Sequence, residues 1–215
     1  LFEVELSTGK SRRLTPEGMW RYDSVTYAPD GRSILLISDQ DRDFLAIARM
    51  DLDTLELSWI FTPEWDVEGF TLSDDQSLGA VIVNDDAVSR LYVVELSQSV
   101  EAGLKELPAP CPLPEGKIST PDFRADGRSL AVSLTATQYK GNIWLSDGLK
   151  SNTGPSAPRQ VTFSSASGFD TSSFATPTQV RYPTFDGREI PGLLYVPEHK
   201  KEDVGSLPVI VYVHG

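Results

Sequence analysis

Few side chains in this sequence could act as a nucleophile or a general base. The two histidines are His199 and His214, and the lone cysteine, Cys111, stands between two prolines. A cysteine or serine nucleophile needs a base within hydrogen-bond reach, and both histidines lie far along the chain from Cys111. The sequence also contains no Gly-x-Ser-x-Gly segment, the strained turn that presents a catalytic serine. We therefore predict an unreactive loop thiol and no catalytic residue within these 215 residues.

Acidic residues at alternate positions could bind calcium, but their surroundings argue against it. Asp39, Asp41 and Asp43 have the spacing of a calcium loop. No glycine follows for the sharp turn, and Met50 stands where a bidentate acid is needed. Asn84-Asp85-Asp86 occupies the corresponding loop further along the chain. We interpret both clusters as solvated hairpin tips, and a single cysteine excludes a cysteine-rich metal site.

The charge balance excludes several classes of partner. The chain has 31 acidic and 19 basic residues, for a net charge of -12. Nucleic acids and anionic membranes would be repelled by such a surface. No run approaches the roughly 18 consecutive apolar residues of a membrane span. We predict a soluble globular chain without a nucleic-acid or membrane partner.

The elements that would position any site recur along the chain. A strand that ends in an acidic residue appears at 1–6, 45–52, 91–96 and 142–147, and the acidic residues are 46, 44 and 52 positions apart. A short closing strand follows in each repeat, at 13–15, 60–62, 106–108 and 160–162. Repeats of about 40 to 50 residues with this content are typical of β-propeller blades. We predict three nearly whole blades and the end of an earlier one.

A tight turn followed by an apolar run marks each repeat. Asp30-Gly31 and Asp126-Gly127 supply the positive φ angles that a hairpin needs. Gln76 replaces the glycine in the middle copy, after Asp74-Asp75, which suggests a different turn type there. Four tryptophans fall within the repeats and are predicted to be blade-packing residues rather than a ligand cage. They are Trp20, Trp59, Trp65 and Trp144.

The blade rhythm ends after Thr162. A stretch rich in Ser, Thr and Ala follows, and then a β-hairpin whose turn is Asp186-Gly187. Residues 208–213 are apolar on both faces and rich in β-branched side chains, so we predict a buried strand that pairs with this hairpin in a helix-covered sheet. The predicted domains are 1–162 for the blades, 163–179 for a linker and 180–215 for the start of a second domain.

The segments YPTFDGREIPGLLYVP (182–197) and LPVIVYVHG (207–215) resemble the prolyl oligopeptidase family of serine peptidases. The resemblance is to the branch with acylaminoacyl peptidases and dipeptidyl peptidases. It implies a mainly β chain, with a partial β-propeller of three to four blades followed by the N-terminal strands of an α/β-hydrolase domain. In the family, a His-Gly pair opens the loop that donates a backbone N–H to the oxyanion. His214 and Gly215 match that pair, with a structural role for His214 rather than that of triad base.

The resemblance further implies a fragment of a peptidase that hydrolyses short peptides. The family's Ser, Asp and His follow later in the chain, so the fragment itself is expected to be inactive, and the propeller would restrict access to the active site. No metal or organic cofactor is implied. The chain starts without Met in a strand pattern, and we expect both ends to be internal to a longer protein. The alternatives are a non-enzymatic propeller scaffold that binds a protein partner, for which blades alone suffice, and an esterase.

Overall fold

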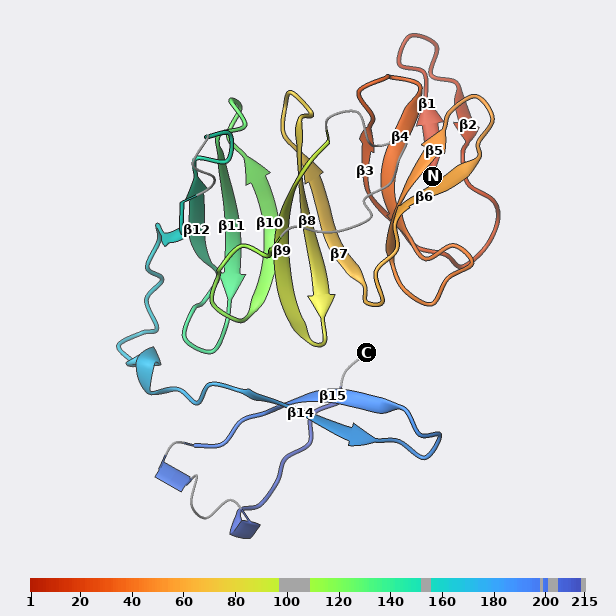
Figure 1. The fold of residues 1–215 in the computed structure, drawn as a ribbon. Coiled ribbons are helices and arrows are strands. Elements are labelled where there is room, and N and C mark those ends of the chain that lie inside the picture. The colour runs from red at the N-terminus through yellow and green to blue at the C-terminus, as the bar shows by residue number, and fades with distance from the viewer. Residues whose placement is uncertain (97–108, 152–155, 198, 201–204, 214–215) are drawn as a thin grey trace.

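The computed structural model describes residues 1–96, 109–151, 156–197, 199–200 and 205–213 (Figure 1). Within these ranges the strands form five separate antiparallel sheets. Three of them stand side by side, and we call them blades 1 to 3. Blade 1 has the order β3 (Tyr22–Tyr27), β4 (Ser33–Ser38), β5 (Ala46–Asp51) and β6 (Leu57–Phe61). Blade 2 contains β7 (Val67–Leu72), β8 (Leu78–Asp85) and β9 (Val88–Glu95). Blade 3 contains β10 (Lys117–Phe123), β11 (Ser129–Thr135), β12 (Asn142–Asp147) and β13 (Arg159–Gln160).

The predicted repeat is confirmed strand by strand. The strands expected at 45–52, 91–96 and 142–147 are β5, β9 and β12. The end of an earlier repeat is the hairpin of β1 (Phe2–Val4) and β2 (Ser11–Arg13). The closing strands at 60–62 and 160–162 correspond to the ends of β6 and β13. The one expected at 106–108 lies outside the described residues.

The three blade turns have one geometry, which corrects the expectation of a different turn at Gln76. Gly31, Gln76 and Gly127 have φ angles of 64°, 54° and 66°. In each turn the aspartate just before this position accepts a hydrogen bond from the backbone N–H two residues after itself, at 2.9, 3.2 and 3.0 Å. Such a bond selects the same turn with or without glycine. The middle copy therefore adopts a left-handed conformation that costs a non-glycine residue energy.

The core lies between the blades, because their central strands bury both faces. In β4, Leu35 and Ile37 pack toward blade 2, while Ile34 and Leu36 pack on the other face with Leu14 of the N-terminal hairpin. In β8, Val81 and Val83 face blade 1, and Ala80 and Ile82 face blade 3. Each fully buried Leu, Ile or Val contributes roughly 1.5–3 kcal/mol. Stacking blade on blade therefore holds this part of the chain together.

Three of the four tryptophans pack as predicted. Trp65 borders the cluster between blades 1 and 2, Trp59 borders the outer cluster of blade 1, and Trp144 borders the cluster between blades 2 and 3. An ion pair also joins blades 2 and 3, from Lys150 to Asp75. The Lys150 ammonium, together with hydroxyls of Ser77 and Ser73, holds the pKa of the Asp75 carboxyl well below its usual range.

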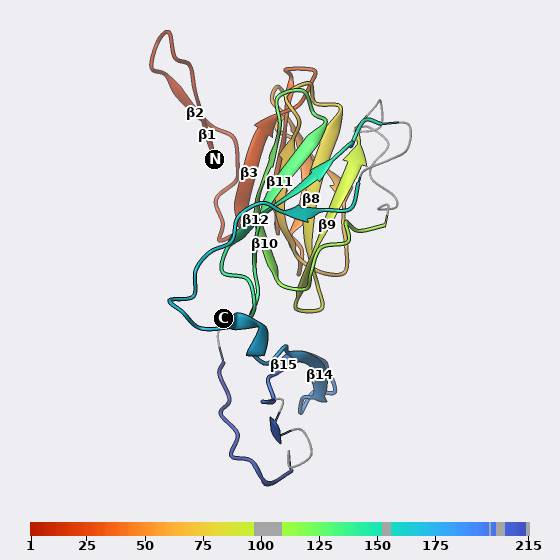
Figure 2. The ribbon, with the colours of Figure 1, turned by 90° about the vertical axis from the view of Figure 1, so that its left-hand side faces the viewer.

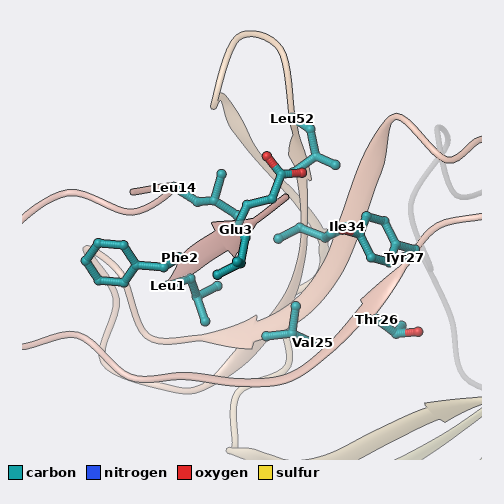
Figure 3. Close-up of a pocket in the computed structure, with 10 residues that line it drawn as sticks. Leu1, Phe2, Glu3, Leu14, Val25, Thr26, Tyr27, Ile34 and Leu52 are labelled. Atoms are coloured by element: carbon teal, nitrogen blue, oxygen red, sulfur yellow. The ribbon is translucent and has the colours of Figure 1, made fainter. Parts of the chain in front are cut away.

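The N-terminal hairpin stands apart from the end of the stack (Figure 2). A cavity of about 230 Å³ lies between it and blade 1, with mainly apolar lining residues that include Leu1, Val25 and Ile34 (Figure 3). The Glu3 carboxylate, also in the lining, accepts a hydrogen bond from Arg12 Nε at 2.6 Å. This cavity is a gap in the packing of apolar side chains and has no cluster of reactive groups.

Beyond blade 3 the chain crosses to a separate hairpin. Ser164 N donates to Asn142 Oδ1 at 2.7 Å and Thr171 Oγ1 donates to Gln138 O at 3.1 Å, so the crossing segment is attached to blade 3. It includes a short 3₁₀ helix, Thr171–Ser173. The predicted hairpin is confirmed as β14 (Thr178–Pro183) and β15 (Glu189–Leu194), with φ of 81° at Gly187.

The prediction of a buried strand at 208–213 is wrong for this structure. These residues belong to no sheet, and the side chains from 209 to 213 are between 76% and 94% exposed. A strand that is apolar on both faces needs sheet neighbours and covering layers, because its side chains have no solvated face. The hairpin β14–β15 is a two-stranded sheet that does not include this segment.

We expect the substitution Gln76→Gly to stabilise the chain by about 0.5 kcal/mol, because relief of the left-handed conformation outweighs the greater chain entropy of glycine in the unfolded state. Gly31→Ala should destabilise it by about 1 kcal/mol. An added Cβ at Gly31 meets no atom within 4 Å, so that loss measures the backbone conformation alone. Urea unfolding followed by tryptophan fluorescence measures both. A lower midpoint for Gln76→Gly would show that the side-chain bond from Gln76 to Tyr27 O dominates.

Candidate functional site

A large cavity lies between blades 2 and 3 and the C-terminal hairpin. Its volume is about 780 Å³. The blade side consists of residues 84–90, 114–117 and 135–139 together with Glu68, and the other side includes Gln179, Leu193 and Tyr195. Figures 1 and 2 both show β14–β15 beyond the ends of the blade strands. The cavity is therefore built from turns and strand ends. There, backbone groups and polar side chains do not take part in core packing and can contact a ligand.

Glu68 is the best-connected carboxylate of the cavity. It lies at an irregularity of β7, where the register with β8 shifts between Val67 and Gly69. Its side chain is 15% exposed and forms an ion pair with Lys117 of blade 3. It also accepts hydrogen bonds from Ser89 Oγ at 2.7 Å and Asn84 Nδ2 at 3.2 Å. A bulge re-aims a side chain out of the strand alternation, and here it lets one carboxylate join both blades.

The two walls of the cavity differ in chemistry. On the blade side, Arg90 Nε lies 3.8 Å from Asp85 Oδ2, and Arg90 Nη2 lies 3.6 Å from Glu115 Oε1. The ion pair of Glu68 with Lys117 adds further charge to this wall. On the hairpin side, Leu193 and Tyr195 are partly exposed apolar side chains. A charged wall facing an apolar and aromatic wall suits a ligand with both polar and apolar groups.

Asp86 joins the blade side to the hairpin. It lies at the tip of β8–β9, and its carboxylate forms an ion pair with Arg181 of β14. Its backbone carbonyl accepts a hydrogen bond from the Gln179 side chain. The hairpin at 84–86 was predicted correctly, but its description as solvated is wrong for Asp86, whose side chain is 15% exposed. The physical reason is that the second hairpin covers this tip.

Of the residues singled out from sequence, the acidic cluster Asn84-Asp85-Asp86 lines this cavity, whereas His199, Cys111 and Asp39 do not. His214 and Gly215, the expected start of an oxyanion loop, lie outside the described residues. His199 is exposed. Cys111 is half-buried against the cluster between blades 2 and 3, and burial raises the pKa of its thiol, which disfavours the nucleophilic thiolate. Asp39 accepts a hydrogen bond from the backbone N–H of Arg21 at 2.7 Å.

Neither a metal-binding cluster nor a membrane-spanning helix occurs among the described residues. Where side chains are described, no group of three or more His, Cys, Asp or Glu residues is placed to hold a metal ion. No helix in the described ranges is long and apolar enough to cross a bilayer.

The sequence analysis did not single out Glu68 or Arg181, and it predicted no partner for Asp86. Glu68 and Lys117 are 49 residues apart, and Asp86 and Arg181 are 95 residues apart. No short motif connects such pairs. The local sequence offers little signal, because Glu68 is one of several polar residues in its stretch, together with Asp66 and Thr71.

Comparison with known proteins identifies the fold. No family model matches the sequence, and no curated protein matches it. Among solved structures, prolyl oligopeptidase B from Galerina marginata, bound to a 35mer substrate, has a TM-score of 0.70 at 17% identity over 92% of this chain and 26% of its own. Puromycin hydrolase has a TM-score of 0.66 at 17% identity over 87% of this chain and 27% of its own.

A third structure, from a study of two prolyl endopeptidases, has a TM-score of 0.63 at 13% identity and covers 88% of this chain. The chain spans about a quarter of the length of these structures. At such identities the likeness shows the fold. It confirms the expected mainly β, propeller-like architecture and its resemblance to structures of the prolyl oligopeptidase group.

We expect Glu68→Ala to destabilise the chain by about 2 kcal/mol, because it leaves Ser89, Asn84 and Lys117 without their common acceptor. Glu56→Ala is the matched control, since Glu56 is exposed on a turn. Its effect should stay within about 0.5 kcal/mol. Urea midpoints of the two variants give the comparison, and equal midpoints would contradict the bridging role of Glu68.

Proposed function

We propose that this chain is part of a serine peptidase of the prolyl oligopeptidase family that hydrolyses short peptides. The observation that carries the proposal is the likeness in fold, over most of this chain, to peptidase structures that include one bound to a peptide substrate. The motif of residues 182–197, with its Asp186-Gly187 turn, supports it independently. In this proposal, residues 1–162 belong to the propeller, 163–179 to the crossing segment and 180–215 to the start of the peptidase domain.

The proposed chemistry belongs to the longer protein. A serine on a strained turn attacks the peptide carbonyl, a histidine takes its proton, and an aspartate orients the histidine. The 215 residues contain no Gly-x-Ser-x-Gly segment, and His199 is exposed in a turn. His214 and Gly215 would begin the loop whose backbone N–H stabilises the oxyanion. This mechanism requires no metal ion or organic cofactor.

The part of this chain in the proposed function is to restrict and bind the substrate. A cavity of about 780 Å³ is within the size of typical small-ligand and peptide sites. Its charged wall would contact the polar backbone of a short peptide, and Leu193 and Tyr195 would contact apolar side chains. Turns that project from the blades around it would exclude folded proteins by size.

Activity measurements separate this proposal from the two alternatives. We expect the 215-residue chain to be inert, whereas the longer protein should cleave short peptide or aminoacyl amides and be inactivated by a serine-directed phosphonylating reagent. A scaffold would show neither property, and an esterase would hydrolyse matched esters while leaving amides nearly untouched. Amide hydrolysis by the purified 215-residue chain would overturn the proposed location of the catalytic residues.

The role of the cavity has its own test in the longer protein. Tyr195→Ala should raise KM for a short peptide about five-fold with little change in kcat, because loss of one aromatic contact costs on the order of 1 kcal/mol. Tyr182→Ala is a matched control: Tyr182 lies in the same hairpin, is also 53% exposed and does not line the cavity. Equal KM values for the two variants would contradict the proposal that the peptide binds in this cavity. The proposal that the longer protein is a peptidase would be unaffected.

A further inference from the structure

The blade side of the large cavity is not charged along its whole length. Its charged lining residues belong to β7, to the tip at 84–90 and to the segment 114–117. The turn at 135–139, between β11 and β12 of blade 3, also lines the cavity and has the sequence Thr-Ala-Thr-Gln-Tyr, without a charge. The lining therefore has a charged part and an uncharged part, and the uncharged part ends at Tyr139.

The apolar residues of the opposite wall lie toward the same turn of blade 3. Thr171 Oγ1 donates to Gln138 O at 3.1 Å, so the crossing segment is attached to this turn before it leads into β14 (Figure 1). Pro177 and Tyr195, both in the lining, are the residues just outside the last register pair of β14 and β15. The contacts of the hairpin with Asp86 of blade 2 begin two residues further along β14. This order places Pro177 and Tyr195 on the blade 3 side of the cavity.

The ring of Tyr139 is fixed by its neighbours. The turn is closed by two backbone hydrogen bonds, from Ala136 N to Tyr139 O at 2.7 Å and from Tyr139 N to Ala136 O at 3.1 Å. The ring packs against Trp144 with a centroid distance of 5.5 Å and an interplanar angle of 88°, an arrangement that aromatic pairs favour. Both rings also pack against the core between blades 2 and 3. A ring that is already ordered loses little freedom when a ligand contacts it, so more of the contact energy appears as affinity.

We propose that Tyr139 is the specificity-determining residue of an apolar subsite at the blade 3 end of the cavity, and that this subsite takes a large apolar or aromatic side chain of the peptide. Ala136 lies beside Tyr139 on the blade side, and Pro177, Leu193 and Tyr195 form the other side. A charged side chain would lose its hydration there without gaining an ionic partner from the turn, and is therefore disfavoured. That the ligand is a peptide rests on the proposed function, whereas the preference for an apolar group follows from the lining.

Binding of three blocked peptides to the 215-residue chain tests the subsite without hydrolysis. The peptides are acetyl-Gly-Gly-Phe-Gly-Gly-amide and the same sequence with alanine or lysine in place of phenylalanine. Titrations are followed by the NMR signal of the Trp144 indole N–H, which lies beside the Tyr139 ring and is assigned by its loss in Trp144→Phe. We expect the phenylalanine peptide to bind about five-fold more tightly than the alanine peptide, and the lysine peptide to bind no more tightly than the alanine peptide.

Two pairs of variants locate the preference. Tyr139→Ala should reduce it to less than about two-fold, whereas Tyr139→Phe keeps the ring and should preserve it. Leu193→Asp places a carboxylate in the subsite and should weaken binding of the phenylalanine peptide about ten-fold. Leu194→Asp is the matched control, because Leu194 is the next residue of β15, is also 42% exposed and does not line the cavity. It should keep the affinity of the parent chain.

The outcomes decide the subsite separately from the peptidase. If Tyr139→Ala fails to fold, as judged by circular dichroism, the comparison of Leu193→Asp with Leu194→Asp decides alone. Equal affinities of the parent chain for the phenylalanine and alanine peptides, no binding of any of the three, or equal effects of the two aspartate substitutions would overturn the subsite. Cleavage of short amides by the longer protein would still support the peptidase in each of these cases.

Discussion

The structure depends on sheets whose central strands are apolar on both faces. Ile34 and Leu36 of β4 point to one side, and Leu35 and Ile37 point to the other. A single sheet of this kind would leave both apolar faces in water, so each blade needs a neighbour on each side. The same demand recurs in β8 between blades 1 and 3. Stacking is therefore a condition for burying the core, and the relative placement of the blades follows from it.

The same requirement explains two groups of exposed apolar residues. At the N-terminal end of the stack, a small cavity separates the first hairpin from blade 1, and Phe2 and Val4 remain exposed. At the other end of the chain, residues 209–213 have the composition of a central strand but belong to no sheet. Their apolar pattern indicates that both faces of such a strand must be buried. It does not indicate which strands pair with it, because side-chain polarity predicts burial and not the pairing partner.

Charge and chemistry gather where the blades end. In the middle of the blades the side chains serve the core, whereas at the strand ends and turns Glu68, Asp86 and Arg90 are available for contacts between elements. These contacts do two things at once, since they join neighbouring elements and they line the cavity. Rigid sheets thus position a polar site on connecting segments, as is usual for binding sites on β scaffolds.

Short-range patterns in the sequence determined the repeat, the blade hairpins and the hairpin at Asp186-Gly187, because strand alternation and turn conformation are decided by neighbouring residues. Even Gln76 obeys its repeat, since the aspartate before it selects the turn. The tertiary structure alone decided that a bulge in β7 directs Glu68 to Lys117, and that Asp86 faces Arg181. These partners are 49 and 95 residues apart. These residues meet only when whole elements pack together. The neighbouring residues in the sequence do not distinguish these charged side chains from other charged residues of the surface.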